Sequence, residues 1–274
     1  MLNVLERRGF SLVEIVLAVV IVLVVTAALH RLLLSTQRLT RKQLQQMALQ
    51  SGVRAGSLVV ANELRELSTR AGGTADENDI LHITPSGIVY RAMRGTGFVC
   101  QAGVDAVRID RARFSGHRDP QAGRDTAYLF VPGDPENGLS ESWLALAITG
   151  VANEACPGAV PAVALTIPGL GVESGVEIGT PVRIAEVAEL RLYQSVGKSW
   201  LGARSVSAGE AIQPVVGPLA DAQGLRLEYL SGAGTPTTDV TGIKSVRITL
   251  RGQMDGLADE ELVTQVTLRN AFRQ

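Results

Sequence analysis

The strongest pattern in the chain is a run of apolar residues close to its N-terminus. Positions 10–29 are apolar except for Ser11, Glu14 and Thr26. Twenty helical residues at about 1.5 Å each span roughly 30 Å, which is the thickness of the hydrocarbon core of a bilayer. The pattern therefore predicts a membrane-spanning helix over residues 10–29.

Behind this run the pattern remains helical. Apolar or small residues recur at three- and four-residue steps, so we expect the helix to continue to about Ala71, where a pair of glycines can end it. The rows expected to pack on the rest of the chain are Leu44, Met47, Ser51, Ala55 and Leu58, and then Val60, Leu64, Leu67 and Ala71. Gly52 and Gly56 each cost up to about 1 kcal/mol inside a helix, which indicates either a bend or close packing.

From residue 80 the pattern changes to short alternating runs separated by Gly, Pro and Asp, which is typical of strands and turns. Two hairpins are predicted, over residues 80–93 and 127–149. Residues 225–229 alternate, and Val246, Ile248 and Leu250 interleave with polar residues, as in an antiparallel strand with one solvated face. The predicted fold class is α+β: a long N-terminal helix, its first half transmembrane, packed on a β-rich, mainly antiparallel C-terminal head.

Composition narrows the function classes. Of the 274 residues, 46% are hydrophobic, and 26 basic residues balance 27 acidic ones. The chain can therefore bury a core, and its net charge does not favour nucleic acid or an acidic substrate as a partner. Seven arginines lie between Arg91 and Arg124, but four aspartates interleave with them and aromatic residues are few. We expect this stretch to be solvated β-surface, and we do not expect nucleic-acid binding.

Glu14 is the exceptional residue of the apolar run. An ionisable group costs a few kcal/mol inside a bilayer, so Glu14 needs a partner or a function. A secretory signal peptide is one alternative, with Arg7 and Arg8 as its basic region and a small-residue cleavage site near Ala27. That alternative leaves Glu14 unexplained. A plain membrane anchor is the other.

The residues around Glu14 form a recognisable string. Residues 7–14 read Arg7-Arg8-Gly9-Phe10-Ser11-Leu12-Val13-Glu14. This string resembles the prepilin leader of type IV pilins and type II secretion pseudopilins. The resemblance implies that a prepilin peptidase cleaves between Gly9 and Phe10 and methylates the new amino group of Phe10. It also implies that Glu14 pairs with that amine on a neighbouring subunit, since paired charges are tolerable in hydrocarbon where single ones are not.

The resemblance also implies how the chain is divided and where it resides. Residues 1–9 are the leader, 10–29 the transmembrane part of the helix, 30–73 its soluble continuation and 74–274 the head. The chain is expected to cross the bacterial inner membrane once, with the head in the periplasm, and later to join a pilus, a pseudopilus or the cell surface. The count of basic residues points the other way, because four follow the span between residues 31 and 42 and two precede it. The motif sets the expected orientation.

Three stretches of the head, residues 182–193, 217–229 and 264–270, resemble the heads of large PilW-like minor pilins and J-type minor pseudopilins. This implies a structural subunit rather than an enzyme, one that initiates or caps assembly of a type IV pilus or a type II secretion pseudopilus. The expected partners are prepilin peptidase, other pilin or pseudopilin subunits through the N-terminal helix, and the inner-membrane assembly platform. A DNA-binding or adhesive minor pilin and a membrane-tethered enzyme with a β-rich head remain as alternatives.

Histidines, which are common in catalytic and metal sites, are few in this chain. The three histidines are His30, His82 and His117, and no two have a spacing that suggests a metal site or a nucleophile–base pair. We therefore expect no catalytic residue, no metal site and no cofactor. Cys100 and Cys156 are predicted to form a structural disulfide, because the periplasm is oxidising and the bridge would be worth roughly 4 kcal/mol. Two buried free thiols are the alternative.

Overall fold

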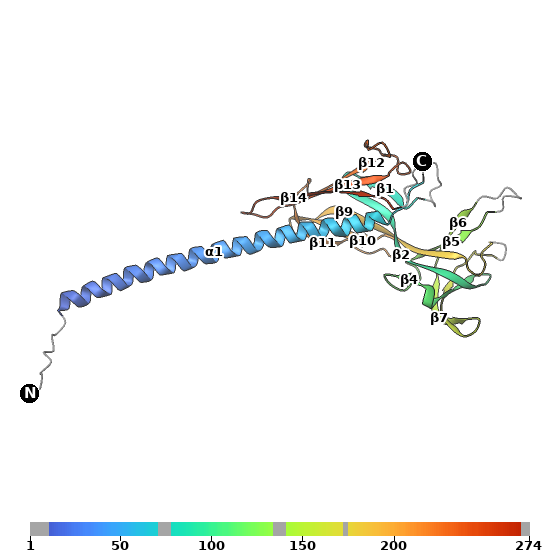
Figure 1. Ribbon diagram of the computed structural model, residues 1–274, viewed down its shortest axis with the longest axis horizontal. Coiled ribbons are helices and arrows are strands. Elements are labelled where there is room, and N and C mark those ends of the chain that lie inside the picture. Colours follow the sequence, from blue (N-terminus) through green and yellow to red (C-terminus); the bar gives the residue numbers. More distant parts are fainter. Residues whose placement is uncertain (1–10, 71–77, 134–140, 172–174, 270–274) are drawn as a thin grey trace, which may run out of the picture. The chain divides into compact units, whose positions relative to one another are not determined.

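The computed structural model describes residues 11–70, 78–133, 141–171 and 175–269. Within them, one long helix precedes a 14-stranded sheet (Figure 1). The elements are α1 (Leu12–Arg65), β1 (Ile80–Thr84), β2 (Gly87–Ala102), β3 (Ala106–Asp110), the 3-10 helix η2 (Arg111–Arg113), β4 (Ser115–Gly116), β5 (Thr126–Val131), β6 (Ser142–Ala147), β7 (Gly150–Cys156), β8 (Val160–Thr166), β9 (Pro181–Ser195), β10 (Lys198–Ser205), β11 (Gln213–Leu219), β12 (Leu225–Leu230), β13 (Ser245–Gly252) and β14 (Glu260–Thr267). All named strand pairs are antiparallel, which confirms the α+β class.

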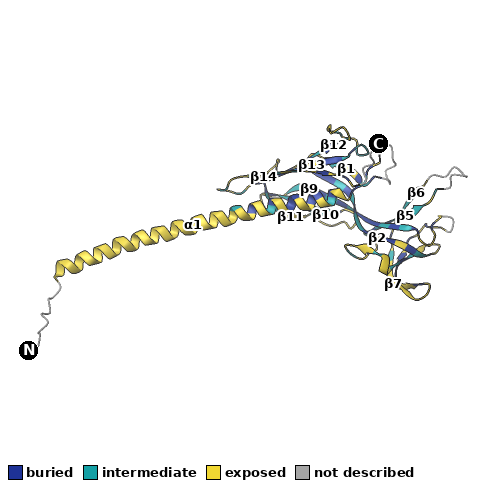
Figure 2. Cartoon of the chain, in the orientation of Figure 1, coloured by how far each residue is buried: buried dark blue, intermediate teal, exposed yellow. Residues whose placement is uncertain are grey.

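The chain divides into two compact units, residues 1–48 and 49–274. In the described part of the first unit, every residue from Ser11 to Gln45 is exposed (Figure 2). Polar side chains of this segment bond to the helix itself: the Thr26 hydroxyl donates to the Val22 carbonyl at 2.7 Å. Such back-bonding satisfies a hydroxyl without any partner outside the helix.

The second unit begins with the part of α1 that is covered by the sheet. Buried residues recur there at three- and four-residue spacing, as expected for a helix with one covered face. They are Leu49, Val53, Gly56, Ser57, Val60, Ala61 and Leu64. The row predicted from Val60 onward is therefore confirmed at Val60, Leu64 and Leu67, although Leu67 lies beyond the end of α1. Ala71 lies outside the described residues. The row that includes Met47 and Leu58 is wrong, because both side chains are exposed. Met47 is two positions from the buried Leu49 and Leu58 two positions from the buried Val60, and residues two apart lie on nearly opposite sides of a helix.

Gly56 marks the closest approach of helix and sheet. A Cβ atom there would lie 2.7 Å from Cγ2 of Val216 on β11, whereas one at Gly52 would have no neighbour within 4 Å. Close packing is therefore confirmed as the reason for Gly56. It does not explain Gly52.

The helix ends at Arg65, earlier than the predicted end near Ala71. Tertiary hydrogen bonds capture the backbone beyond it: the Ser68 amide donates to the Asp79 carboxylate at 2.7 Å, and the Arg70 amide donates to the Asn78 side chain at 2.8 Å. These acceptors are remote in sequence, so the helical pattern could not reveal them. The glycine pair at residues 72 and 73 lies outside the described residues.

The sheet runs in the order β12-β13-β11-β10-β9-β2-β3-β8-β7. It contributes to two separate hydrophobic cores. The first, called here the helix core, joins α1 to β2, β9, β10, β12 and β13 and includes Val60, Leu64, Tyr90, Leu190 and Val246. The second, called here the sheet core, lies among β2, β3, β5, β8 and β9 and includes Val99, Ile109, Leu129, Leu165 and Ile184. Fully burying one such leucine or isoleucine contributes about 1.5–3 kcal/mol.

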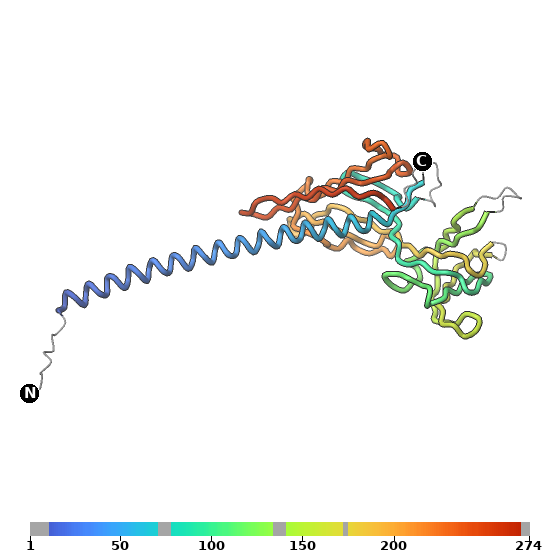
Figure 3. The backbone as a smooth tube through the Cα atoms, viewed as in Figure 1, coloured from blue at the N-terminus to red at the C-terminus, as the bar shows by residue number. Residues whose placement is uncertain are grey.

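The long strands β2 and β9 are neighbours in the sheet (Figure 3). Both strands contribute residues to both cores. Along β2, Tyr90 belongs to the helix core and Val99 to the sheet core. The pairing register between β2 and β9 shifts between Met93 and Gly95, so Arg94 is the extra residue of a β-bulge. A bulge shifts the alternation of side chains by one position, which explains why even-numbered residues are buried before it and odd-numbered ones after it.

The hairpins and alternating strands are found where the sequence predicts them. Thr84 lies opposite Gly87 in the first hairpin, and β5 pairs with β6 in the second. Val246, Ile248 and Leu250 are completely buried on β13. The alternation of apolar and polar residues was therefore a reliable guide to which face of this strand is covered.

Candidate functional site

The residues that carry the expected function lie at the start of α1. Glu14 stands in the first turn of the helix, where its amide donates to the Ser11 carbonyl at 2.9 Å. Its carboxylate is exposed and contacts no other described residue through a hydrogen bond or ion pair. Gly9 and Phe10 lie outside the described residues.

Apolar side chains surround Glu14 on every side of the helix. Leu12, Val16 and Val20 are about half exposed or more, as are the other large apolar residues up to Leu33. This segment is long and apolar enough to cross a membrane. It is a candidate membrane anchor or signal segment on these properties.

A charged cluster that the sequence did not predict lies between the two cores. Glu186 on β9 is surrounded by Val182 and Ile184 of the sheet core on one side and Ala188 and Leu190 of the helix core on the other. Only 3% of its side chain is exposed. A carboxylate buried this deeply is costly unless it is paired.

Three donors meet the Glu186 carboxylate. Arg94 and Arg124 each donate through Nε at 2.5 Å, and the Ser205 hydroxyl donates at 2.8 Å. Arg118 adds an ion pair at 3.5 Å. Burial alone would raise the pKa of Glu186, but these donors outweigh it and lower the pKa to about 2. The carboxylate is therefore ionised at neutral pH and acts as an anchor for the arginines.

The cluster extends to the helix and to a loop. Glu63 of α1 pairs with Arg94 at 3.6 Å and accepts a hydrogen bond from the Tyr90 hydroxyl at 3.1 Å. Burial, followed by the charge of Glu63, raises the pKa of Tyr90, so this phenol stays protonated. Arg124 also reaches Glu210, in the loop between β10 and β11, at 2.8 Å. Helix, both long strands and this loop are thus joined through one set of charges.

The arginines of this cluster correct one sequence-based expectation. Arg94, Arg118 and Arg124 are not solvated β-surface: Arg118 makes two bonds of 2.6 and 2.7 Å to the buried carboxylate of Asp125, and the other two hold Glu186. Hydrogen bonding to Asp125 raises the pKa of Arg118. The available signal was on β9, where Glu186 interrupts an otherwise apolar set of alternate positions.

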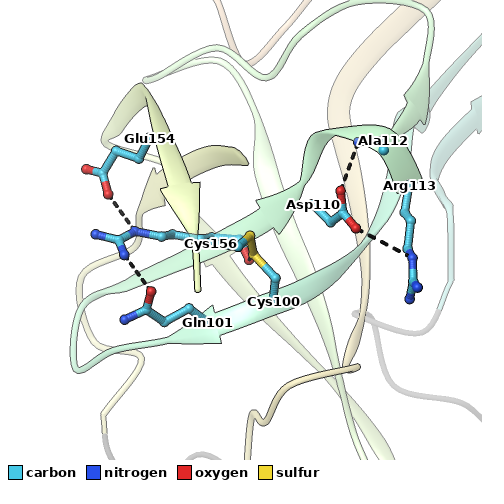
Figure 4. The surroundings of a disulfide bond; sticks show 8 residues. Cys100, Gln101, Asp110, Ala112, Arg113, Glu154 and Cys156 are labelled. Carbon is cyan, nitrogen blue, oxygen red and sulfur yellow. Dashed lines mark hydrogen bonds and ion pairs between the residues drawn. A yellow bond between two sulfur atoms is a disulfide. The ribbon is translucent and has the colours of Figure 1, made fainter. Parts of the chain in front are cut away.

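Cys100 and Cys156 are joined by a disulfide, with their Cα atoms 5.8 Å apart (Figure 4). β3 and β8 lie between their strands, β2 and β7, in the sheet order. Three strand spacings of about 4.8 Å would separate the cysteines by at least about 14 Å in a flat sheet, so this part of the sheet must curl. The curl explains why β8 is buried on both faces, with Ala162 and Ala164 on one and Val163 on the other.

A small cavity of about 130 Å³ opens beside the sheet core. Two cation–π contacts line it: Arg91 lies 5.5 Å from the centre of the Tyr128 ring, and Arg183 lies 5.4 Å from that of Trp143. Arg183 also pairs with Asp79 at 3.7 Å. Burial raises the pKa of Asp79, although Arg183 acts against this shift. Two of the charged residues that line this cavity, Arg183 and Asp79, therefore pair with each other.

No cluster of three or more His, Cys, Asp or Glu side chains suited to a metal ion was found in the part of the chain that the structure describes. Comparison with protein-family models, curated proteins and solved structures found no match to this chain. The functional assignment therefore depends on the N-terminal residues and on the physical properties of the helix that follows them.

Proposed function

We propose that this chain is a minor type IV pilin or a type II secretion pseudopilin, a structural subunit without catalytic activity. The observation that carries the proposal is the string from Arg7 to Glu14, which leads directly into an exposed apolar helix. The Glu14 carboxylate supports it further: it is exposed and has no hydrogen bond or ion pair with another described residue, and such a group inside a bilayer requires a partner.

The proposed sequence of events starts in the inner membrane. Residues 10–29 span it with the head in the periplasm, and prepilin peptidase cleaves between Gly9 and Phe10 and methylates the new amine. Glu14 then pairs with the Phe10 amine of a neighbouring subunit as the helix leaves the membrane through the assembly platform. Pairing within hydrocarbon would favour one axial register between adjacent helices.

The two hydrophobic cores of the head are tied together, and this supports a structural role in the proposal. They are fixed to each other by long strands, by the charges around Glu186 and by the covering of α1 from Leu49 onward. We propose a PilW-like minor pilin or a J-type pseudopilin that initiates or caps a filament. A pilus and a secretion pseudopilus are both compatible with this role.

The test replaces Glu14 with Ala and measures membrane insertion, cleavage of the leader and incorporation into filaments. Insertion and cleavage are expected to be normal, because an unpaired carboxylate disfavours insertion and the Gly9–Phe10 junction is untouched. Incorporation into sheared filaments is expected to fall by on the order of a hundredfold or more, since leaving one member of a buried pair alone costs about 3–5 kcal/mol.

Thr26→Ala is the matched control. Within the described part of the chain its hydroxyl bonds only to the Val22 carbonyl of the same helix, so its loss is expected to leave incorporation unchanged. If the chain caps the filament, the defect of Glu14→Ala appears as fewer filaments, so filament number is counted as well. Normal incorporation together with a normal number of filaments would show that Glu14 has no assembly role.

A further inference from the structure

β6 (Ser142–Ala147) is an open edge of the sheet. Among the described residues it pairs with β5 alone, and none of its backbone groups bonds elsewhere. Its six residues read Ser-Trp-Leu-Ala-Leu-Ala and carry no charge. Proteins commonly protect exposed edges with charges, Pro or covering elements, because an unprotected edge can pair with another strand.

Two other edges of the same sheet, β14 and β12, are protected. β14 contains Glu260 and Glu261, and α1 contacts it through a hydrogen bond between the Ser57 and Thr264 hydroxyls and one from Gln50 to Glu260. β12 is covered by the turn of the first hairpin, whose Pro85 carbonyl accepts from the Leu227 amide at 2.7 Å. Among the described residues, the lack of charge and cover therefore distinguishes β6 from β12 and β14.

The two faces of β6 have different chemistry. Leu144 and Leu146 pack against the sheet core, yet both remain only partly buried at its margin. On the opposite face Trp143 contacts Phe130 edge-to-face, with ring centres 5.4 Å apart, and Ala145 lies opposite Tyr128. A strand added to β6 would complete the sheet core if it supplied apolar residues on the leucine face and small ones beside the tryptophan.

We propose that β6 is the interface of a symmetric homodimer, in which the β6 strands of two copies of this chain pair in antiparallel orientation. A two-fold axis perpendicular to the sheet keeps each side chain on its own face, so residues of the same parity lie opposite each other. The register centred on Ala145 places Leu144 opposite Leu146 of the second copy. It also places Trp143 opposite Ala147.

This register is self-complementary in size and in charge. Two Leu–Leu pairs extend the sheet core across the axis, and each large tryptophan meets a small alanine, so neither face is overfilled. Apolar cross-strand pairs each contribute roughly 0.2–1 kcal/mol beyond the new backbone hydrogen bonds. No charged side chain of β6 opposes a like charge. A second copy thus meets the requirements of both faces. The inference is independent of the proposed function.

A charge-swap experiment tests the register. Ala145→Lys and Ala145→Glu chains are purified at full length in detergent, and their masses are measured by light scattering against the unaltered chain. The unaltered chain is expected to be a dimer. Each variant alone places like charges opposite each other at the axis, which is expected to weaken dimerisation on the order of tenfold or more. An equal mixture of the two variants is expected to restore the dimer.

Val263→Lys is the matched control on the protected edge strand β14, where the side chain is 52% exposed. It is expected to remain a dimer. Circular dichroism melting checks that each variant is folded. A monomeric unaltered chain overturns the proposal. So does a dimer that survives both single variants, which would place the contact elsewhere, for example in the apolar helix. The proposal is also contradicted if an equal mixture of the two variants does not form the dimer.

Discussion

Replacing Glu186 with Gln would remove the negative charge at the junction of the two cores while leaving the shape of the side chain nearly unchanged. Arg94 and Arg124 would then keep their partly buried guanidinium groups, which are 18% and 26% exposed, without the carboxylate that both hold. We expect the substitution to destabilise the folded head because a buried ion pair broken from one side leaves the other charge uncompensated.

The size of the effect follows from the pKa of Glu186, which lies at about 2 instead of 4.5. Since one pKa unit corresponds to 1.36 kcal/mol, the folded chain favours the ionised carboxylate by about 3 kcal/mol. The sign is that of a lowered pKa: the stabilisation is complete above pH 4.5 and is lost as the pH falls towards 2. At pH 3 less than half of it should remain.

The assay is urea unfolding of the full-length chain in detergent, followed by the fluorescence of Trp143 and Trp200. Glu186→Gln is expected to lower the free energy of unfolding by about 3 kcal/mol at pH 7 and by less than half of that at pH 3. Glu154→Gln is the control, because Glu154 pairs with Arg108 at the surface, where both side chains are more than a third exposed. It should cost less than about 1 kcal/mol.

Two results would refute this reasoning. One is an equal loss for Glu186→Gln and Glu154→Gln at pH 7, which would mean that burial does not strengthen the pairing. The other is a loss from Glu186→Gln that is the same at pH 3 and pH 7, which would mean that the ionised carboxylate is not the stabilising species.

Two further stability predictions concern the disulfide and the helix glycines. Cys100→Ser should lower the free energy of unfolding by about 4 kcal/mol, because the bridge to Cys156 closes a separation of 56 residues; a reductant should have the same effect on the unaltered chain and none on the variant, and equal stability of both forms would contradict a structural bridge. Gly56→Ala should lower the melting temperature, since its Cβ would lie 2.7 Å from Val216. Gly52→Ala should raise the melting temperature, because nothing lies within 4 Å and Ala is worth up to about 1 kcal/mol more in a helix; the opposite order would contradict the packing described for α1.

The parts of the fold that depend on local pattern could be predicted from the sequence. The helix follows from its apolar run, and the hairpin of β1 and β2 follows from its turn residues. The covered face of β13 follows from alternation at Val246, Ile248 and Leu250. In each of these cases the determining residues are neighbours in the sequence, so a period of 3.6 or 2 is enough.

The parts that depend on distant partners could not be predicted in the same way. The end of α1 is set by Asp79 and Asn78, and the junction between the cores is set by arginines that lie 62 and 92 residues from Glu186. Which side of the helix the sheet covers is likewise decided by the sheet, so the row through Met47 was misassigned. The sequence alone does not show that these residues lie close together in the folded chain.

The most direct test of the proposed identity is the intact mass of the chain isolated from the membranes of its host. The proposal predicts a mature protein that begins at Phe10 and carries one added methyl group, with residues 1–9 removed. Tandem mass spectrometry of the N-terminal peptide should place the methyl group on the Phe10 amine. An uncleaved chain would indicate a plain membrane anchor. A mature N-terminus near Ala28 would indicate cleavage by signal peptidase and would remove the apolar helix on which the proposed filament assembly depends.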